Sequence, residues 1–260
     1  MPATVHHLNC ASFHPPLVGR MVAHCLLVER DEGLLLVDTG FGTEDLADPR
    51  RLGRPFRAAM RPLLLPEETA VAQLAALGFA PEDVIDIALT HLDLDHAGGL
   101  GDFPRARVHV HETELAAARD PHGMEHGRYL SVQWADARFV THRTAGDEWL
   151  GFESVTVLDD DVLLVPLHGH SRGHAGVAVR RGDGGWLLHA GDAYFHTGDL
   201  TDPPTTPRTF RVVQRILAQD DTARLANQER LRTFAADHAD DVTVFSAHDP
   251  REFAALTAGS

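Results

Sequence analysis

The chain of 260 residues contains no lysine: all 23 basic residues are arginine, against 38 acidic residues, and the formal net charge is −15. Proteins that bind nucleic acids need basic surfaces to displace counterions from the phosphates, so this charge argues against a nucleic-acid partner. The same charge argues against docking on an anionic membrane. We therefore expect no nucleic acid and no membrane among the partners of this protein.

Cysteine and long apolar runs are also scarce. Cys10 and Cys25 are the only two cysteines; they could pair, but two reduced and buried thiols fit a cytoplasmic protein better. No apolar stretch reaches membrane-spanning length, and residues 1–7 lack the basic start and apolar centre of a signal peptide. The expected location is therefore the cytoplasm.

Histidine, in contrast, is abundant, with 18 residues, and the densest group of metal-capable side chains is Thr90-His91-Leu92-Asp93-Leu94-Asp95-His96-Ala97-Gly98-Gly99. This segment directly follows the apolar run 84–89. Side chains two residues apart in an extended chain point to the same side, so His91 and Asp93 can converge on one ion. Asp95 and His96 lie where the chain turns and can face a second ion. The alternative is a polar loop in which Asp95 caps a helix.

Three later segments also place a metal-capable residue just after an apolar run. They are His168-Gly169-His170-Ser171-Arg172-Gly173-His174 after residues 162–165, Asp192 after residues 186–188, and His248 after residues 242–245. Side chains at strand ends along one edge of a sandwich can converge on a single groove. The sequence therefore predicts one metal site assembled from four segments.

Strands and helices alternate in two halves of the chain. The first half predicts a hairpin of strands 21–30 and 34–37, a helix from 66 to 78, the strand that leads to His91, a strand at 107–110 and a helix at 111–119. The second half predicts strands at 154–158, 162–165, 176–180 and 186–189, helices near 210–218 and 222–238, and a last strand at 242–245. Strands followed by helices, twice over, predict two βα halves with sheets inside and helices outside.

We expect these halves to form one domain over residues 1–260. Residues 41–65 are rich in Arg, Pro and Gly and are expected to form an excursion over the surface. Together with residues 120–150 and 195–210, they are expected to wall the groove.

The order and spacing of these residues resemble the metallo-β-lactamase superfamily. Its pattern is His-x-His-x-Asp-His, a His within a Gly-His-x-x-Gly-His segment, an Asp after a strand and a late His; Asp38-Thr39-Gly40 after an apolar strand is also typical. The resemblance extends from Met21 to His248 and implies an α/β fold, a four-layer αββα sandwich, with two divalent metal ions. Carried over position by position, it implies three sets of ligands: His91, Asp93 and His170 for the first ion, Asp95, His96 and His248 for the second, and Asp192 as the bridge.

Asp93 departs from this pattern because most members have His there. The flavodiiron branch has a Glu at this position and binds iron. Two divalent ions bring four positive charges, and Asp93, Asp95, Asp192 and a bridging hydroxide balance all four. An oxygen-richer shell favours harder ions, so we expect zinc from the family but expect Mn or Fe to compete with it.

Two further groups of residues are interpreted through the resemblance. His174 is expected to hydrogen-bond behind the ligands, and Asp38 to be a buried hydrogen-bonding anchor. In the quorum-quenching lactonase branch a Tyr lies three residues after the bridging Asp and assists catalysis. Here that position is Phe195, while Tyr194 lies one residue earlier, so Tyr194 is a catalytic candidate with packing as the alternative.

The resemblance implies a binuclear metal-dependent hydrolase that uses a metal-bridging hydroxide to cleave an ester, lactone or amide-type bond of a small-molecule substrate. Asp95 or Asp192 could carry the proton to the leaving group. Many β-lactamases of this fold hold the substrate carboxylate with a lysine, so the absence of lysine disfavours that activity. The alternatives are an iron-dependent oxidoreductase, which would need a separate flavin partner, and a non-catalytic metal- or ligand-binding protein. The sequence does not predict the oligomeric state.

Overall fold

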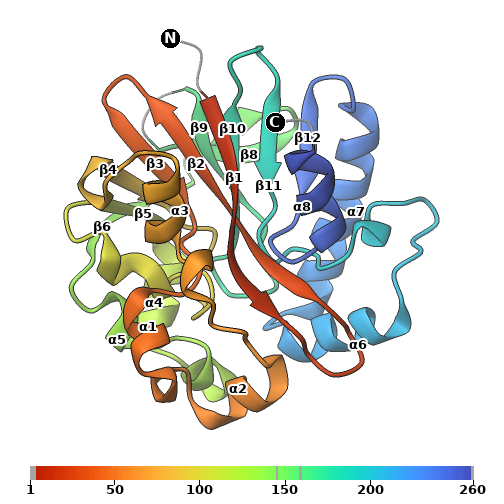
Figure 1. Ribbon diagram of the computed structural model, residues 1–260. Coiled ribbons are helices and arrows are strands. Elements are labelled where there is room, and N and C mark those ends of the chain that lie inside the picture. Colours follow the sequence, from red (N-terminus) through yellow and green to blue (C-terminus); the bar gives the residue numbers. More distant parts are fainter. Residues whose placement is uncertain (1–3, 145, 158–159, 259–260) are drawn as a thin grey trace.

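Two six-stranded sheets form the centre of the molecule in the computed structural model, which describes residues 4–144, 146–157 and 160–258 (Figure 1). The first sheet has the order β1 (Thr4–Phe13), β2 (Met21–Arg30), β3 (Gly33–Val37), β4 (Val84–Ala88), β5 (Arg107–His111) and β6 (Arg138–His142). The second has the order β12 (Val242–Phe245), β11 (Trp186–His189), β10 (Ala175–Arg180), β9 (Val162–Pro166), β8 (Phe152–Thr156) and β7 (Asp147–Trp149). Each half of the chain thus contributes one sheet.

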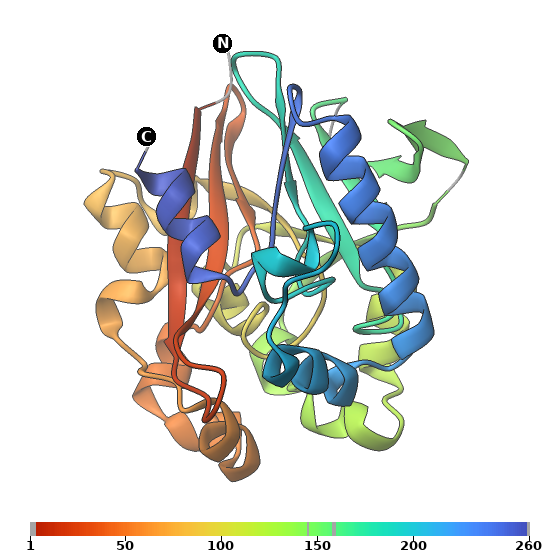
Figure 2. The ribbon, with the colours of Figure 1, turned by 90° about the vertical axis from the view of Figure 1, so that its right-hand side faces the viewer.

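Helices cover the outer faces of both sheets. The longer ones are α3 (Ala70–Ala76), α4 (Glu112–Arg119), α6 (Arg208–Leu217), α7 (Asp221–Asp237) and α8 (Pro250–Thr257). Helix α2 (Arg54–Met60), as long as α3, and the shorter helices α1 (Thr43–Ala47) and α5 (Ser131–Trp134) lie in the connections. In Figure 2 the two sheets lie side by side, with α3 outside the first and α7 outside the second. Among the described residues, no helix combines the length and apolar character needed to cross a membrane.

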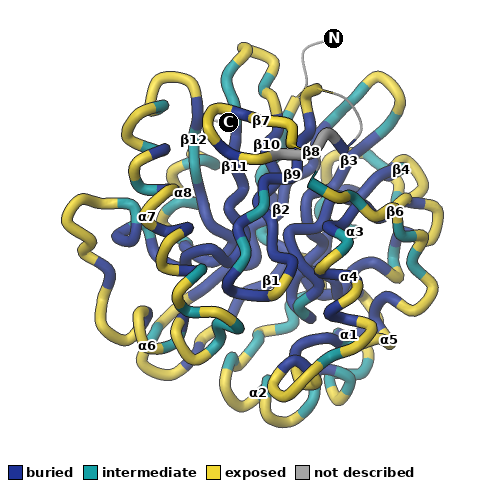
Figure 3. Tube along the Cα trace, turned by 180° about the vertical axis from the view of Figure 1, so that it is seen from behind, coloured by how far each residue is buried: buried dark blue, intermediate teal, exposed yellow. Residues whose placement is uncertain are grey.

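The strand β2 shows why the layers form. Its residues Leu26 and Val28 pack in the core between the sheets, against Leu164 and Val177 of the second sheet. Leu27, on the opposite face, packs in the core beneath the helices of the first half. A strand covered on both faces needs apolar side chains on both, which is why β2 reads as a nearly continuous apolar run. Figure 3 shows these strands as the buried centre of the fold.

Strand direction decides where the site lies. β10 pairs antiparallel with both β9 and β11, and β11 pairs parallel with β12, so β9, β11 and β12 all run the same way. In the first sheet β3, β4 and β5 are parallel. The carboxyl ends of these strands therefore lie together at one edge of each sheet, and polar loops follow them there.

The four-layer αββα sandwich predicted from the sequence is confirmed. The hairpin of β2 and β3 and the strands and helices of the second half lie close to their predicted bounds, although Leu158 at the end of the strand predicted at 154–158 falls outside the described residues. Residues 41–65, expected to form an excursion over the surface, contain the two short helices α1 and α2. It also adds β1 and α8, whose sequences carry weaker periodicity.

Candidate metal centre

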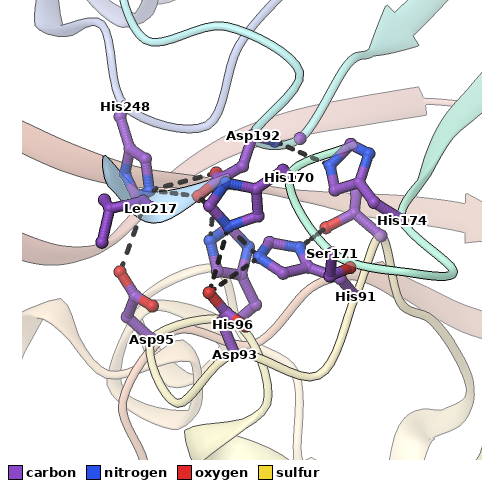
Figure 4. Close-up of polar contacts among 12 residues, drawn as sticks. His91, Asp93, Asp95, His96, His170, Ser171, His174, Asp192, Leu217 and His248 are labelled. Carbon is purple, nitrogen blue, oxygen red and sulfur yellow. Dashed lines mark hydrogen bonds and ion pairs between the residues drawn. The ribbon is translucent and has the colours of Figure 1, made fainter. Parts of the chain in front are cut away.

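The four predicted segments meet at this edge of the sandwich. The loop after β4 carries His91, Asp93, Asp95 and His96, and His170, Asp192 and His248 follow β9, β11 and β12 respectively. Their side chains form two groups, in each of which the possible ligand atoms lie within 4.8 Å of one another (Figure 4). The first group is His91, Asp93, His170 and Asp192, and the second is Asp95, His96 and His248.

Asp192 lies between the two groups and turns one oxygen toward each. Its Oδ2 is 3.3 Å from His170 Nε2 and 3.8 Å from His91 Nε2. Its Oδ1 is 3.3 Å from His96 Nε2 and 3.1 Å from His248 Nε2, which also lies 3.2 Å from Oδ2. A single carboxylate therefore faces both groups in the manner of a bridge between two ions.

The remaining distances fit metal coordination. Asp93 Oδ2 lies 3.1 Å from His170 Nε2 and 3.5 Å from His91 Nε2, and Asp95 Oδ2 lies 3.8 Å from His248 Nε2. Ligand atoms at about 2.0–2.2 Å from one ion stand roughly 3–4 Å apart. Three buried atoms of the described residues that face the groups, His91 Nε2, His96 Nε2 and Asp192 Oδ1, have no hydrogen-bond partner. Nitrogen and oxygen atoms of this kind, left without protein partners, suit a divalent ion.

Hydrogen bonds at the far side of three imidazoles orient them. His91 Nδ1 contacts Thr90 Oγ1 at 2.9 Å, His96 Nδ1 contacts Asp38 Oδ2 at 2.8 Å, and His248 Nδ1 contacts the carbonyl of Val22 at 2.7 Å. Each contact leaves Nε2 directed at the carboxylates. Asp38 also accepts from the backbone N–H and the hydroxyl of Thr90, at 2.8 Å each, so it anchors both ends of the ligand loop. This is the buried role expected for it.

The charges of the centre depend on one another. Burial favours a raised pKa for Asp192, but His248, His96 and His170 outweigh it and hold the pKa well below its usual value. Burial favours a lowered pKa for His96, but Asp192 and Asp38 outweigh it and raise the pKa well above its usual value. The pKa of His248 is raised against burial in the same way, chiefly by Asp192. A proton must leave each of these two imidazoles before a metal binds, so metal affinity falls as the pH is lowered.

Arg128 is a residue of the centre that sequence reasoning missed. It follows a short helical turn, Gly123–Gly127, and is only 9% exposed. Its Nε lies 3.1 Å from Asp93 Oδ1, its Nη1 donates to the carbonyl of His170 at 2.6 Å, and its Nη2 donates to the carbonyl of Leu217 at 2.8 Å.

Burial opposes ionisation of Asp93, but Arg128 is the leading cause that holds the pKa of Asp93 well below its usual value. Burial and Arg128 together lower the pKa of His170 to about 4, so His170 is neutral and able to bind metal. Arg128 is one of many arginines, and no sequence signal near it marks it.

Glu114 is a second residue that the sequence did not reveal. It lies on α4 with no exposed surface, and its carboxylate accepts from the backbone N–H of Leu92 at 3.0 Å, the hydroxyl of Ser171 at 2.7 Å and the N–H of Gly173 at 3.0 Å. It therefore joins the loop after β4 to the loop after β9. The two loops pack so closely here that a Cβ on Gly173 would lie 2.0 Å from the backbone nitrogen of Glu114.

Two expectations about neighbouring residues have different outcomes. His174 lies where expected: its Nδ1 contacts the carbonyl of Leu167 at 3.0 Å, and its Nε2 accepts from the backbone N–H of Asp192 at 2.9 Å. The catalytic role of Tyr194 stays a prediction, and its position favours the packing alternative. Its side chain is fully buried and its hydroxyl donates to Glu252 at 2.9 Å, away from the two groups. Phe195 contacts the centre instead, with its ring 5.1 Å from that of His248.

A cavity of about 310 Å³ opens onto the two groups. Asp93, Asp95, Asp192, His170 and His248 form its polar side. Its other walls are mainly apolar and include Pro55, Phe56, Met60, Leu94, Met124, Phe195, Ile216 and Leu217. Segments 41–65 and 120–150 therefore contribute to the wall as expected, whereas residues 195–210 contribute Phe195, and α6 supplies a wall that was not expected.

Comparison with known proteins agrees with this geometry. A model of the metallo-beta-lactamase superfamily matches residues 18–246. A Mycobacterium tuberculosis protein described as a "probable metallo-hydrolase" is 42% identical over 254 residues, which cover 96% of this chain and 81% of that protein. The N-acyl homoserine lactonase AttM of Agrobacterium fabrum is 29% identical over 230 residues, or 88% of this chain and 82% of that one.

Solved structures share the fold. An N-acyl homoserine lactone hydrolase, solved with N-hexanoyl-L-homoserine at its catalytic metal centre, has a TM-score of 0.74 at 21% identity, covering 98% of this chain and 95% of that chain. A probable metal-dependent hydrolase from Staphylococcus aureus has a TM-score of 0.70 at 17% identity, covering 95% and 89%. Because the family model spans most of the sequence and the 42% identical relative spans nearly all of it, this protein belongs to the metallo-β-lactamase superfamily.

Proposed function

We propose that this protein is a binuclear metal-dependent hydrolase that cleaves an ester, lactone or amide-type bond of a small, uncharged or weakly charged molecule. The observation that carries the proposal is Asp192, whose two oxygens face two groups of ligand atoms at the base of one cavity. The relatives named above are metallo-hydrolases and lactonases, which supports hydrolysis as the reaction.

The proposed ligands divide as the two groups do. His91, Asp93 and His170 would hold one ion, Asp95, His96 and His248 the other, and Asp192 both. Ions held there supply Lewis acidity toward a carbonyl oxygen and a water of lowered pKa. We propose zinc as the native metal, with Mn or Fe as competitors because of the oxygen ligand Asp93. Elemental analysis of protein purified without added metal tests this, and a clean two-zinc result would remove the competitors.

The protein side of the reaction is binding, orientation and proton transfer. The apolar walls around Phe56, Met60 and Leu217 would bind an apolar part of the substrate and exclude water from it. Asp95 and Asp192 both border the cavity, so either carboxylate can carry a proton to the leaving group. With no lysine in the chain, a substrate carboxylate has no lysine partner, so a neutral ester or lactone fits better than a β-lactam.

A substrate panel on metal-quantified protein tests the proposal. Aryl esters and lactones with acyl chains of increasing length are incubated with protein of known metal content, before and after removal of metal by a chelator. We expect turnover that is lost with the metal and returns when the metal is restored. A bound iron centre with a visible absorption band and no hydrolysis would favour the oxidoreductase alternative. Two bound metals with no turnover across the panel would favour the binding protein.

The apolar wall leads to a prediction about chain length. Ile216 lies on α6, borders the cavity and is 60% exposed, so a charged residue is tolerated there by the fold. Ile216→Asp is expected to lower kcat/KM for the longest acyl chain about tenfold, the cost of roughly 1–1.5 kcal/mol of lost apolar contact, and to leave the acetyl substrate nearly unchanged. The matched control is Leu225→Asp on α7, which is 52% exposed and is not among the cavity residues. Equal losses for short and long chains, or in the control, would contradict this use of the wall.

A further inference from the structure

The two oxygens of Asp93 face different partners. Oδ2 lies among the first group, 3.1 Å from His170 Nε2 and 3.5 Å from His91 Nε2. Oδ1 lies 3.1 Å from Arg128 Nε and forms an ion pair with it. The carboxylate is thus divided between the proposed metal position and a buried guanidinium.

The guanidinium is itself held in place. Arg128 Nη1 donates to the carbonyl of His170 and Nη2 to the carbonyl of Leu217, at 2.6 and 2.8 Å, and Nη2 also lies 3.3 Å from His170 Nε2. The side chain of Arg128 borders the cavity but is only 8% exposed, so most of its surface is used by these protein contacts. Its contact with Asp93 Oδ1 is an ion pair without hydrogen-bond geometry, so the fixed guanidinium acts on the carboxylate through its charge and position.

The charge of Arg128 compensates for Asp93, which stands where most members of the family have His. With a histidine at that position, two divalent ions, two carboxylates and a hydroxide leave one positive charge, whereas Asp93 removes it. The buried cation of Arg128 restores that single charge beside the same group. Asp93 and Arg128 together therefore replace, in charge, what most members of the family have as a neutral imidazole.

We propose that Arg128 is a positioning residue for the first metal group: its charge neutralises Asp93 and draws Oδ1 toward the guanidinium, so that Oδ2 faces the ion. This inference rests on the proposed metal site. It differs from a general structural role, because a residue that only tied down the loops of His170 and Leu217 would matter equally whatever stood at position 93.

A double-mutant cycle on metal affinity separates these roles. Zinc affinity is measured by chelator competition for the wild type, Arg128→Gln, Asp93→His and the double variant. Arg128→Gln keeps an amide donor for a carbonyl but loses the charge. In the wild-type background it is expected to weaken zinc binding at one of two sites by about 10- to 100-fold. In the Asp93→His background it is expected to cause no loss of affinity, because no carboxylate remains to be balanced and the substitution removes one of two excess positive charges.

Two further measurements complete the test. Cobalt-substituted protein reports ligand geometry through its visible spectrum, which Arg128→Gln should change in the wild-type background and not in the Asp93→His background. Arg51 contacts Asp45 Oδ1 at 3.2 Å and the carbonyl of Val132 at 3.2 Å, outside the two groups, so Arg51→Gln is the matched control and should leave zinc affinity unchanged.

The outcomes are distinct. The inference would be overturned by equal losses of zinc affinity in both backgrounds or by no loss in either. It would also be overturned if adding Arg128→Gln to the Asp93→His variant unfolded the metal-free protein, as judged by circular dichroism. If Arg128→Gln fails to fold only beside Asp93, Arg128→Lys, which keeps the charge but not the planar guanidinium, replaces it in the cycle. An equal change of zinc affinity in both backgrounds would then overturn the inference. A wild type that binds no metal would overturn the proposed function as well. If the wild type binds two metals and the effects of the two substitutions on zinc affinity simply add, only the role of Arg128 is overturned.

Discussion

Asp192→Asn is expected to lower kcat/KM by at least about 10³-fold, equivalent to about 4 kcal/mol, and to reduce metal content from two ions toward one. Asparagine keeps one acceptor oxygen but turns an NH₂ donor toward the other group and removes the negative charge. Because the two oxygens of Asp192 lie 3.1–3.3 Å from His96, His170 and His248, the substitution affects both groups at once. Kinetics and metal content measured on the same sample check the prediction.

The control for Asp192→Asn is Asp240→Asn, which removes one carboxylate from an exposed position just after α7. It should leave kcat/KM and metal content unchanged, since it lies outside both groups. A residual kcat/KM within tenfold of wild type for Asp192→Asn, with two metals still bound, would reject Asp192 as the bridge.

Glu114→Ala is expected to lower the free energy of unfolding by about 3–5 kcal/mol and to weaken metal binding with it. The carboxylate satisfies two buried backbone N–H groups and one hydroxyl, on Leu92, Gly173 and Ser171, and each donor left without a partner costs about 1–3 kcal/mol. Those donors belong to the two loops that carry His91 and His170, so their loss also loosens the first group. Urea denaturation of metal-loaded and metal-free protein measures both effects.

Glu112→Ala is the natural control for Glu114→Ala because both residues lie on α4. Glu112 pairs with Arg143 at the surface, and surface ion pairs of this kind add little to stability. The free energy of unfolding of Glu114→Gln should lie between those of Glu114→Ala and Glu112→Ala, since glutamine keeps the volume and one acceptor. A Glu114→Ala protein as stable as Glu112→Ala would show that the two loops are held together by other contacts.

The seven proposed metal ligands were all named from the sequence: their segments follow apolar runs at strand ends, and the resemblance to the family selects the ligands within them. Strand polarity then makes their convergence almost unavoidable: β9, β11 and β12 run in one direction, and β4 ends at the same edge of the sandwich. The fold was predictable for the same reason, since two βα halves with apolar strands have few ways to bury both faces of each sheet. Local spacing sufficed for His91, Asp93, Asp95 and His96.

The contacts that the sequence did not reveal have a different origin. Tyr194 was judged by its offset from Asp192, but its direction depends on the backbone between β11 and the following turn, and only the folded chain directs its hydroxyl to Glu252. Arg128 and Glu114 act on Asp93 and Ser171, which lie far from them along the chain, and a single sequence carries no sign of such pairings.

The sequence by itself determined the αββα architecture and placed metal-capable residues after its strands, because hydrophobic period and residue spacing are local properties. The resemblance to the family then gave the proposed ligand set. Only the tertiary structure decided how those ligands are supported. Three features arise from contacts between segments far apart in the chain: the cavity walls from α2 and α6, the hydrogen bonds by which Glu114 joins two loops, and the ion pair of Arg128 with Asp93. Burial and charge at such contacts depend on everything packed around them, which is why the environment of Asp93 could be judged from the fold and not from the motif that contains it.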